Sequence, residues 1–179
     1  MSGKGIWYIL FVRTGAEEDV CTFLNHTGIN SFIPKKEVIY RREGRSIIQI
    51  RPMFPGYLFI TSDLPQEQLH AVLQQMRSRK SGIVKELYYD REGTSALTAA
   101  EQDMLEGLLD QDQVLTASTG IIENDQVVVL QGPLKGYESR IVRIDRHKRQ
   151  ALLELNLCTR KVQVSVALEV IQKMHTTEK

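Results

Sequence analysis

Apolar residues along the chain occur in short runs whose spacing alternates between that of strands and that of helices. Ile6–Val12 is a continuous apolar run rich in β-formers, which predicts a buried strand because it is too short for most helices. Thr14 and Glu17 follow with the spacing of a capping box and predict a helix that ends near Gly28. The apolar residues that this helix would bury are Val20, Cys21, Phe23 and Leu24.

A β-hairpin is predicted next, because Lys36–Arg41 and Ser46–Arg51 flank a turn that contains Gly44. Its tip is basic. The arginines concerned are Arg41, Arg42 and Arg45. Such a charge run is either a solvated surface or a contact with a phosphate backbone, and the pattern leaves both interpretations open.

Phe54–Ile60 combines a turn at Pro55–Gly56 with a short strand that is apolar on both faces. Tyr57 and Phe59 share one face, since alternate residues of a strand point to the same side. One interpretation is a central strand covered on both sides. The other is an aromatic face that docks a partner.

Two further helices follow. Asp63 and Pro65 mark the start of the first, whose apolar residues form one stripe. These are Leu69, Val72, Leu73 and Met76. Gly82–Leu87 predicts another strand, and Thr98 and Glu101 form a second capping box. The helix that it opens has an apolar side made of Met104, Leu105, Leu108 and Leu109.

Beyond these helices the pattern changes. Gln111–Gly120 has no periodicity and is interpreted as a linker. Short alternating strands are then predicted at Gln126–Leu130, Tyr137–Ile144, Ala151–Leu157, Arg160–Val166 and Leu168–Ile171. Five short strands in about 55 residues suit a small closed β-barrel.

Composition excludes some broad classes. A hydrophobic content of 42% and a charged content of 25% are ordinary globular values. No apolar run approaches the roughly 18 residues that span a bilayer, and the start lacks a signal-peptide core, so a cytoplasmic protein without membrane contact is expected. Cys21 and Cys158 lack metal-ligand spacing and are expected to be free thiols.

The net charge of +1 conceals a segregation of charge along the chain. Residues 1–91 contain 13 Lys and Arg against 9 Asp and Glu. No Lys or Arg lies between Arg91 and Lys135, whereas residues 135–174 contain nine basic and four acidic residues. Two basic regions separated by an acidic one indicate two modules with a connecting segment.

Nothing in the residue inventory predicts an enzyme. Four His, two Cys and scattered carboxylates form no recognisable acid–base pair or ligand spacing. Gly132–Gly136 lacks the spacing of a phosphate-binding loop. We therefore expect no catalytic residue, metal ligand or cofactor.

Several segments together resemble the NusG family of transcription elongation factors across nearly the whole chain. They are Trp7–Leu10, Phe54–Phe59, Asn124–Val127 and Gly132–Gly136, in the family's order and spacing. The resemblance implies an α+β fold. It comprises an N-terminal NusG-type domain (residues 1–110) with a mainly antiparallel sheet and packed helices, a linker (111–120), and a C-terminal KOW domain (121–175) built as an SH3-like β-barrel.

The resemblance also implies function. The family's N-terminal domain binds the clamp helices of RNA polymerase and suppresses pausing, and its C-terminal module recruits a further factor. The positions that match polymerase-binding residues are Phe11, Phe54, Tyr57, Phe59 and His70. Some members carry a hydroxyl-rich triplet at His70, from which Ala71 and Val72 depart. The positions expected near upstream and non-template DNA are Arg41, Arg42, Arg45, Arg77 and Arg79.

The C-terminal block departs from the general family pattern at Tyr137–Arg140 and is more basic than expected. It resembles instead the specialised LoaP-type paralogues, which promote readthrough and whose KOW domain is implicated in contacting a nascent RNA hairpin. The candidate RNA-binding residues are Lys135, Arg140, Arg143, Arg146, His147, Lys148, Arg149, Arg160 and Lys161. We expect a monomer. Two alternatives stay open: a general NusG-like factor that couples polymerase to the ribosome or a termination factor, and an RNA-binding module that acts without polymerase.

Overall fold

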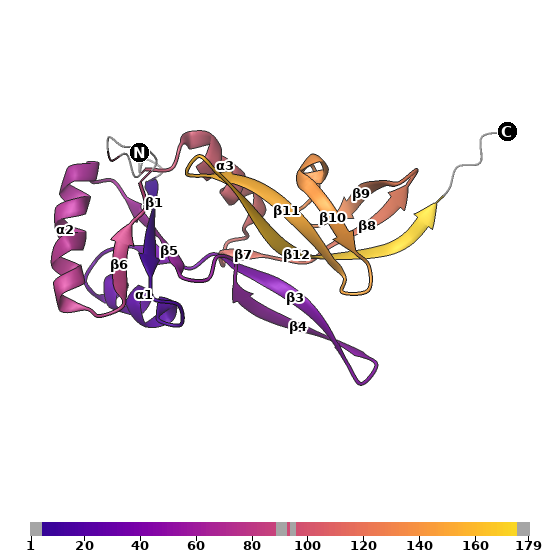
Figure 1. Ribbon diagram of the computed structural model, residues 1–179, viewed down its shortest axis with the longest axis horizontal. Helices are drawn as coiled ribbons and strands as arrows, with labels where there is room; N and C mark the ends of the chain where they lie inside the picture. Colours follow the sequence, from indigo (N-terminus) through magenta and orange to yellow (C-terminus); the bar gives the residue numbers. More distant parts are fainter. Residues whose placement is uncertain (1–4, 89–92, 94–95, 175–179) are drawn as a thin grey trace. The chain divides into compact units, whose positions relative to one another are not determined.

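The structure, a computed structural model, describes residues 5–88, 93 and 96–174 (Figure 1). The described residues form a mixed α/β fold with three α-helices and three sheets. The chain divides into two compact units. Unit 1 consists of Met1–Pro34, Phe54–Met104 and Leu157–Arg160, and unit 2 of Lys35–Met53, Leu105–Asn156 and Lys161–Lys179. In the part of the chain that is described, no helix is long and apolar enough to cross a membrane.

Unit 1 contains a four-stranded sheet in the order β2-β5-β1-β6. Its strands are β1 (Ile6–Val12), β2 (Ser31–Phe32), β5 (Tyr57–Ser62) and β6 (Ile83–Glu86). The interior strand β1 pairs antiparallel with both β5 and β6. Residues on both faces of β1 are buried, which explains why its sequence is continuously apolar. The predicted first strand is confirmed.

Helices α1 (Glu17–His26) and α2 (Gln66–Arg79) pack on one face of this sheet (Figure 1). The core between them includes Leu10, Leu58 and Ile60 from the strands. The α2 stripe is confirmed: Leu69, Leu73 and Met76 are buried, and Val72 is partly buried against the core. The remaining members of this core from α1 are Val20, Cys21 and Leu24.

The two predicted capping boxes have different outcomes. Thr98 and Glu101 form the second one, since each side chain bonds the backbone amide of the other, at 3.3 and 2.9 Å, before α3 (Ala99–Leu108). The first prediction is wrong. Helix α1 has Ala16 as its N-cap without a side-chain cap bond, because the Glu17 carboxylate is directed elsewhere.

Unit 2 contains a three-stranded sheet in the order β4-β3-β7. Strands β3 (Lys35–Arg42) and β4 (Arg45–Pro52) form the predicted hairpin around a two-residue turn, in which Glu43 and Gly44 have φ of 52° and 78°. Strand β7 (Val114–Leu115) lies parallel to the start of β3. The Lys36 ammonium donates to the Ser165 carbonyl oxygen at 2.5 Å, and burial lowers the pKa of Lys36.

The second sheet of unit 2 has five strands in the order β10-β11-β12-β8-β9. They are β8 (Ser118–Glu123), β9 (Gln126–Gln131), β10 (Ile141–Asp145), β11 (Gln150–Leu157) and β12 (Arg160–Met174). Among the described residues β10 and β9 are the outer strands, an order compatible with a half-barrel. The KOW and SH3-like assignment stays a prediction.

Three local predictions in this region differ from the structure. The segment interpreted as a linker contains β7 and the start of β8, because Val114 and Leu115 are buried by pairing with β3. Tyr137–Arg140 is a turn with a 3₁₀-helix, η1 (Glu138–Arg140), in place of the first half of a strand. The last two predicted strands are one, β12, because it continues from the β11 hairpin into parallel pairing with β8.

Candidate functional site

Unit 1 carries a set of aromatic side chains on the side of its sheet opposite α1 and α2. In the β1–β5 register Phe11 pairs with Tyr57, so the two rings point to the same side. Their centroids are 5.2 Å apart, and both side chains are half-buried. We call Phe11 and Tyr57 the aromatic pair. It leaves part of two aromatic rings accessible beside a closely packed sheet.

Phe59 lies deeper than the aromatic pair and is 1% exposed. Its ring contacts those of Trp7, Phe32 and Phe54 at centroid distances of 6.1, 5.7 and 5.9 Å. Phe54 is also buried. The expectation that Phe59 would lie open on the face of Tyr57 is therefore corrected, because three neighbouring aromatic rings enclose it.

The turn before β5 sets the position of the aromatic pair. The Val12 amide donates to the Gly56 carbonyl at 2.8 Å, and the Tyr57 amide donates to the Phe54 carbonyl at 3.1 Å. Gly56 has φ of +84°, and a Cβ built there would lie 3.3 Å from the Phe11 ring. Glycine is required at this position because of both its backbone conformation and its close neighbours.

Glu17 is a residue of this site that the sequence pattern did not reveal. It is 6% exposed, and its carboxylate accepts hydrogen bonds from the backbone amides of Gly15 and Gly56 at 2.6 and 2.7 Å. The bond to Gly56 crosses 39 positions of sequence. The sequence shows only that Glu17 is an acidic residue in the first turn of a helix. This indicates the start of the helix but does not identify Gly56 as the hydrogen-bond partner.

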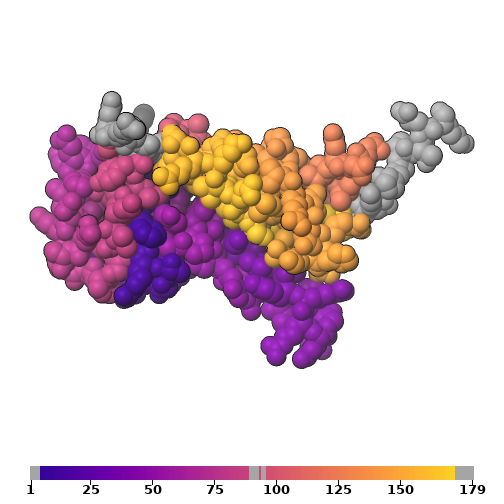
Figure 2. All heavy atoms as spheres, in the orientation of Figure 1, coloured from indigo at the N-terminus to yellow at the C-terminus, as the bar shows by residue number. Residues whose placement is uncertain are grey.

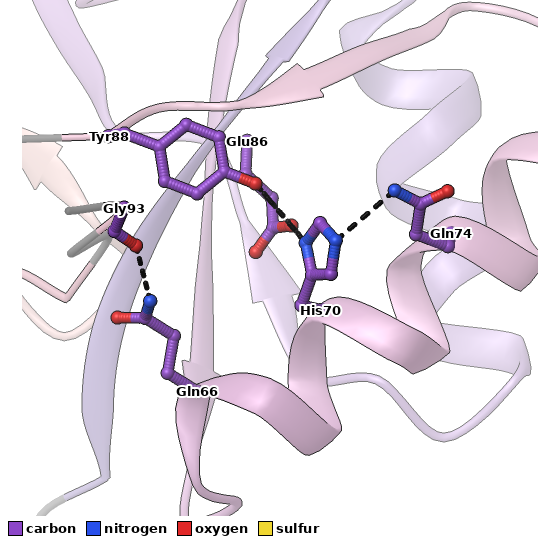
Figure 3. Close-up of polar contacts among 6 residues, drawn as sticks. All are labelled: Gln66, His70, Gln74, Glu86, Tyr88 and Gly93. Atoms are coloured by element: carbon purple, nitrogen blue, oxygen red, sulfur yellow. Dashed lines mark hydrogen bonds and ion pairs between the residues drawn. The ribbon is translucent and has the colours of Figure 1, made fainter. Parts of the chain in front are cut away.

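A second polar cluster surrounds His70 on α2 (Figure 3). His70 Nδ1 bonds the Glu86 carboxylate and lies 3.2 Å from the Tyr88 hydroxyl, while its Nε2 lies 3.2 Å from the Gln74 amide nitrogen. The His70 side chain is 42% exposed and that of Glu86 is 6% exposed. Both ring nitrogens are thus held by protein side chains, while the ring remains partly exposed.

Glu86 influences the ionisation of two neighbouring tyrosines. Burial first, and then the negative charge of Glu86, raises the pKa of Tyr88 and of Tyr8. One Glu86 oxygen, Oε1, is buried and has no hydrogen-bond partner among the described residues. The sequence pattern singled out His70 alone, since Glu86 and Tyr88 reach it from a strand and a loop distant in sequence.

The five arginines predicted to lie near DNA belong to two separate elements. Arg77 and Arg79 occupy the last turn of α2, where the Arg79 guanidinium lies 5.9 Å from the centre of the Phe23 ring. The other three, Arg41, Arg42 and Arg45, are exposed at the tip of the β3–β4 hairpin.

The predicted RNA-binding residues do not gather in one patch. Arg146, His147 and Lys148 are exposed in the β10–β11 turn, where Arg149 is half-buried. Lys161 lies beyond the other end of β11 and pairs with Glu154 at 3.0 Å. The remaining members are Lys135, Arg140, Arg143 and Arg160, of which Arg140 is half-buried and the others are exposed. The basic side chains thus lie at the two ends of β11, within β10 and η1, and in the turn after β9.

Comparisons with known proteins find relatives of this chain in one family. A family model described as "Transcription termination factor nusG" matches residues 5–104, more than half of the chain. The Thermus thermophilus "Transcription termination/antitermination protein NusG" is 24% identical over 93% of this chain and 97% of its own. A solved structure titled "Domain interaction in Thermotoga maritima NusG" covers 92% of this chain and 94% of its own, with 16% identity and a TM-score of 0.43. Because the family model spans most of unit 1 with its aromatic residues, this chain belongs to the NusG family of transcription termination and antitermination factors.

Proposed function

We propose that this protein binds RNA polymerase through the aromatic pair and suppresses pausing and termination. The supporting observation is the half-exposed Phe11 and Tyr57 rings on a sheet whose other face is filled by helices. Aromatic side chains are enriched at the centres of protein interfaces, and such a surface suits the tip of a helical coiled coil. In this proposal the buried Phe54 and Phe59 support the pair from within.

The test is the affinity of the purified protein for core RNA polymerase without nucleic acid. We expect Tyr57→Ala to weaken binding by about 30-fold, the effect of a central aromatic anchor. Tyr40→Ala is the matched control, because Tyr40 is an exposed tyrosine on a different element, the hairpin. Unchanged affinity of a folded Tyr57→Ala protein would remove the aromatic pair from the interface.

His70 is proposed as a polar contact to polymerase. Glu86 bonds its Nδ1 and Gln74 its Nε2, and the side chain is still 42% exposed, so a partner can reach the ring together with Gln74. His70→Ala should weaken the same binding several-fold. A loss of stability without a loss of affinity would make the cluster purely structural.

The basic residues are proposed to contact nucleic acid around the transcribing polymerase. The hairpin and α2 arginines would lie near upstream and non-template DNA, and the C-terminal basic residues near nascent RNA. Phosphate contacts of this kind add affinity without sequence information. A division into domains 1–110 and 121–175 is a proposal of the same standing, and the joining residues 111–120 then include β7 and the start of β8. The monomeric state and a cytoplasmic location are proposals as well. Light scattering tests the monomer, and fluorescence microscopy of a tagged protein tests its location.

A LoaP-type role in a long operon is the finer proposal, supported by the basic β10–β11 turn, in which Arg146, His147 and Lys148 are exposed. Transcription in vitro on a template with an RNA hairpin in its leader should show readthrough that the protein increases. Removal of the hairpin should abolish this increase. Readthrough that does not depend on the leader would favour a general NusG-like factor.

A further inference from the structure

Unit 2 contains a groove between the β3–β4 hairpin and the β10–β11 turn, with a volume of about 310 Å³. Arg149 joins its two walls: Nη1 donates to the Ser46 hydroxyl of β4 at 2.5 Å. The same nitrogen lies 3.5 Å from the Glu169 carboxylate of β12. Figure 2 shows the hairpin and the turn as adjoining surfaces. One guanidinium thus connects three elements and holds the groove in shape.

The groove is positively charged. Arg41 contributes a cation from β3, and Lys148 and Arg149 contribute cations from the turn, where His147 also lines the groove. Among the described residues that line it, none is acidic. Asp145 lies at the end of β10, where its carboxylate accepts a bond from the Lys148 amide at 3.0 Å and lies 3.9 Å from the Lys148 ammonium. Hydrogen bonds from the turn and the nearby Lys148 hold the pKa of Asp145 below its usual value.

We propose that this groove binds the phosphodiester backbone of a single nucleic-acid strand. Arg41, Lys148 and Arg149 are cations at neutral pH and come from two elements, so that consecutive phosphates can contact both walls. A volume of about 300 Å³ is at the lower end of small-ligand sites and suits one or two nucleotides rather than a duplex. Arg41 and the basic turn then form one site, although the family resemblance assigned them separately to DNA and to RNA.

This inference rests on the nucleic-acid part of the proposed function and makes no use of the aromatic pair. The experiment measures the fluorescence anisotropy of labelled oligouridylate and oligodeoxythymidylate of about twelve nucleotides, a length within the usual range for single-strand binding sites. The full-length protein is titrated without polymerase. Arg41→Gln and Lys148→Gln should each weaken binding about eightfold at 0.05 M salt. Each variant loses one phosphate contact, and one contact adds about 0.7 to the slope of the logarithm of affinity against the logarithm of salt concentration.

Arg51→Gln is the matched control. It removes the same charge from the same hairpin. Arg51 does not itself line the groove and lies on the face opposite Arg41, over the ring of Tyr40, which does line it. We expect less than a twofold effect, and we expect the two oligonucleotides to compete for one site. If both groove variants weaken the binding of only one of the two oligonucleotides, the groove proposal is supported. The affected oligonucleotide then shows whether the groove binds RNA or DNA.

Two results would overturn the proposal. In the first, Arg41→Gln affects DNA alone, Lys148→Gln affects RNA alone, and the two oligonucleotides bind together. In the second, Arg51→Gln weakens binding as much as Arg41→Gln, which indicates attraction by overall charge. If Tyr57→Ala still weakens polymerase binding in that case, only the groove proposal fails, and the proposed binding of polymerase through the aromatic pair stands.

Discussion

The Glu17 carboxylate accepts a hydrogen bond from the Gly56 backbone amide at 2.7 Å and so joins the start of α1 to the turn before β5. Its second oxygen accepts from the Gly15 amide. Both bonds involve a buried charged group, so each is stronger than a neutral bond at the surface. This contact fixes the point at which the strand with Tyr57 begins.

Removal of the Glu17 carboxylate should therefore destabilise the protein. We expect Glu17→Ala to lower the free energy of unfolding in urea by about 3 kcal/mol, since two amides lose a charged acceptor. Glu67→Ala is the control, because Glu67 is an exposed acidic residue in the first turn of α2. Its effect should stay below about 0.5 kcal/mol. Equal effects of the two substitutions would contradict the account.

Gly56→Ala tests the turn itself. The substitution places a Cβ in the left-handed region, where an L-residue loses about 1 kcal/mol, and also against the Phe11 ring. Gly28→Ala is matched in backbone conformation, with φ of +86°, but its Cβ would meet nothing within 4 Å. Gly56→Ala should cost about 1 kcal/mol more in urea unfolding than Gly28→Ala, and should also weaken polymerase binding. Identical losses would show that the close contacts of the new Cβ with Phe11 and Thr14 are unimportant.

The elements that sequence predicted correctly are those with a strong local pattern. The α2 stripe and the continuous apolar run of β1 are periodic enough to determine both element and buried face. The Glu43–Gly44 turn follows from the preference of a two-residue hairpin for positive φ. These features depend on residues near one another in sequence, which is why they could be predicted.

The rest depends on tertiary pairing. The burial of Phe59 requires three aromatic rings from β1, β2 and the turn before β5. Val114 and Leu115 form a strand because β3 is beside them, although their own segment has no periodicity. The bond from Gly56 to Glu17 and that from His70 to Glu86 join residues whose local sequences carry no sign of the partner.

Glu86→Gln should make the neighbouring tyrosines ionise at lower pH. The charge of Glu86 is the second cause, after burial, of the raised pKa of Tyr88 and Tyr8. Removal of this charge should lower the pKa of both tyrosines, measured from the absorbance of tyrosinate as the pH is raised. The part of the pKa increase that burial causes should remain. Glu154→Gln serves as the control, because Glu154 contacts Lys161 and Gln163 instead of a tyrosine. An unchanged titration would show that Glu86 carries no charge near these phenols.

The ionisation of Cys158 should lower the free energy of unfolding at alkaline pH. Burial, and then Glu101, raises the pKa of the Cys158 thiol from 9.0 to about 11. Between pH 9.0 and about 11 the Cys158 thiol therefore keeps its proton in the folded state and loses it in the unfolded state. The contribution of the protonated thiol to the free energy of unfolding is complete below pH 9.0 and is lost as the pH rises toward about 11. Urea unfolding at several pH values should show a shallower alkaline decline in Cys158→Ala than in the unchanged protein. Parallel declines would contradict this assignment.

Photo-crosslinking from position 57 tests the central claim most directly. A photoreactive aromatic residue replaces Tyr57 in one protein and Tyr40 in another, and each is irradiated in complex with RNA polymerase. We predict a polymerase crosslink from position 57 and none from position 40, since the hairpin is not part of the proposed interface with polymerase. A position-57 protein that binds polymerase but forms no crosslink would contradict the claim that the aromatic pair is the polymerase-binding surface.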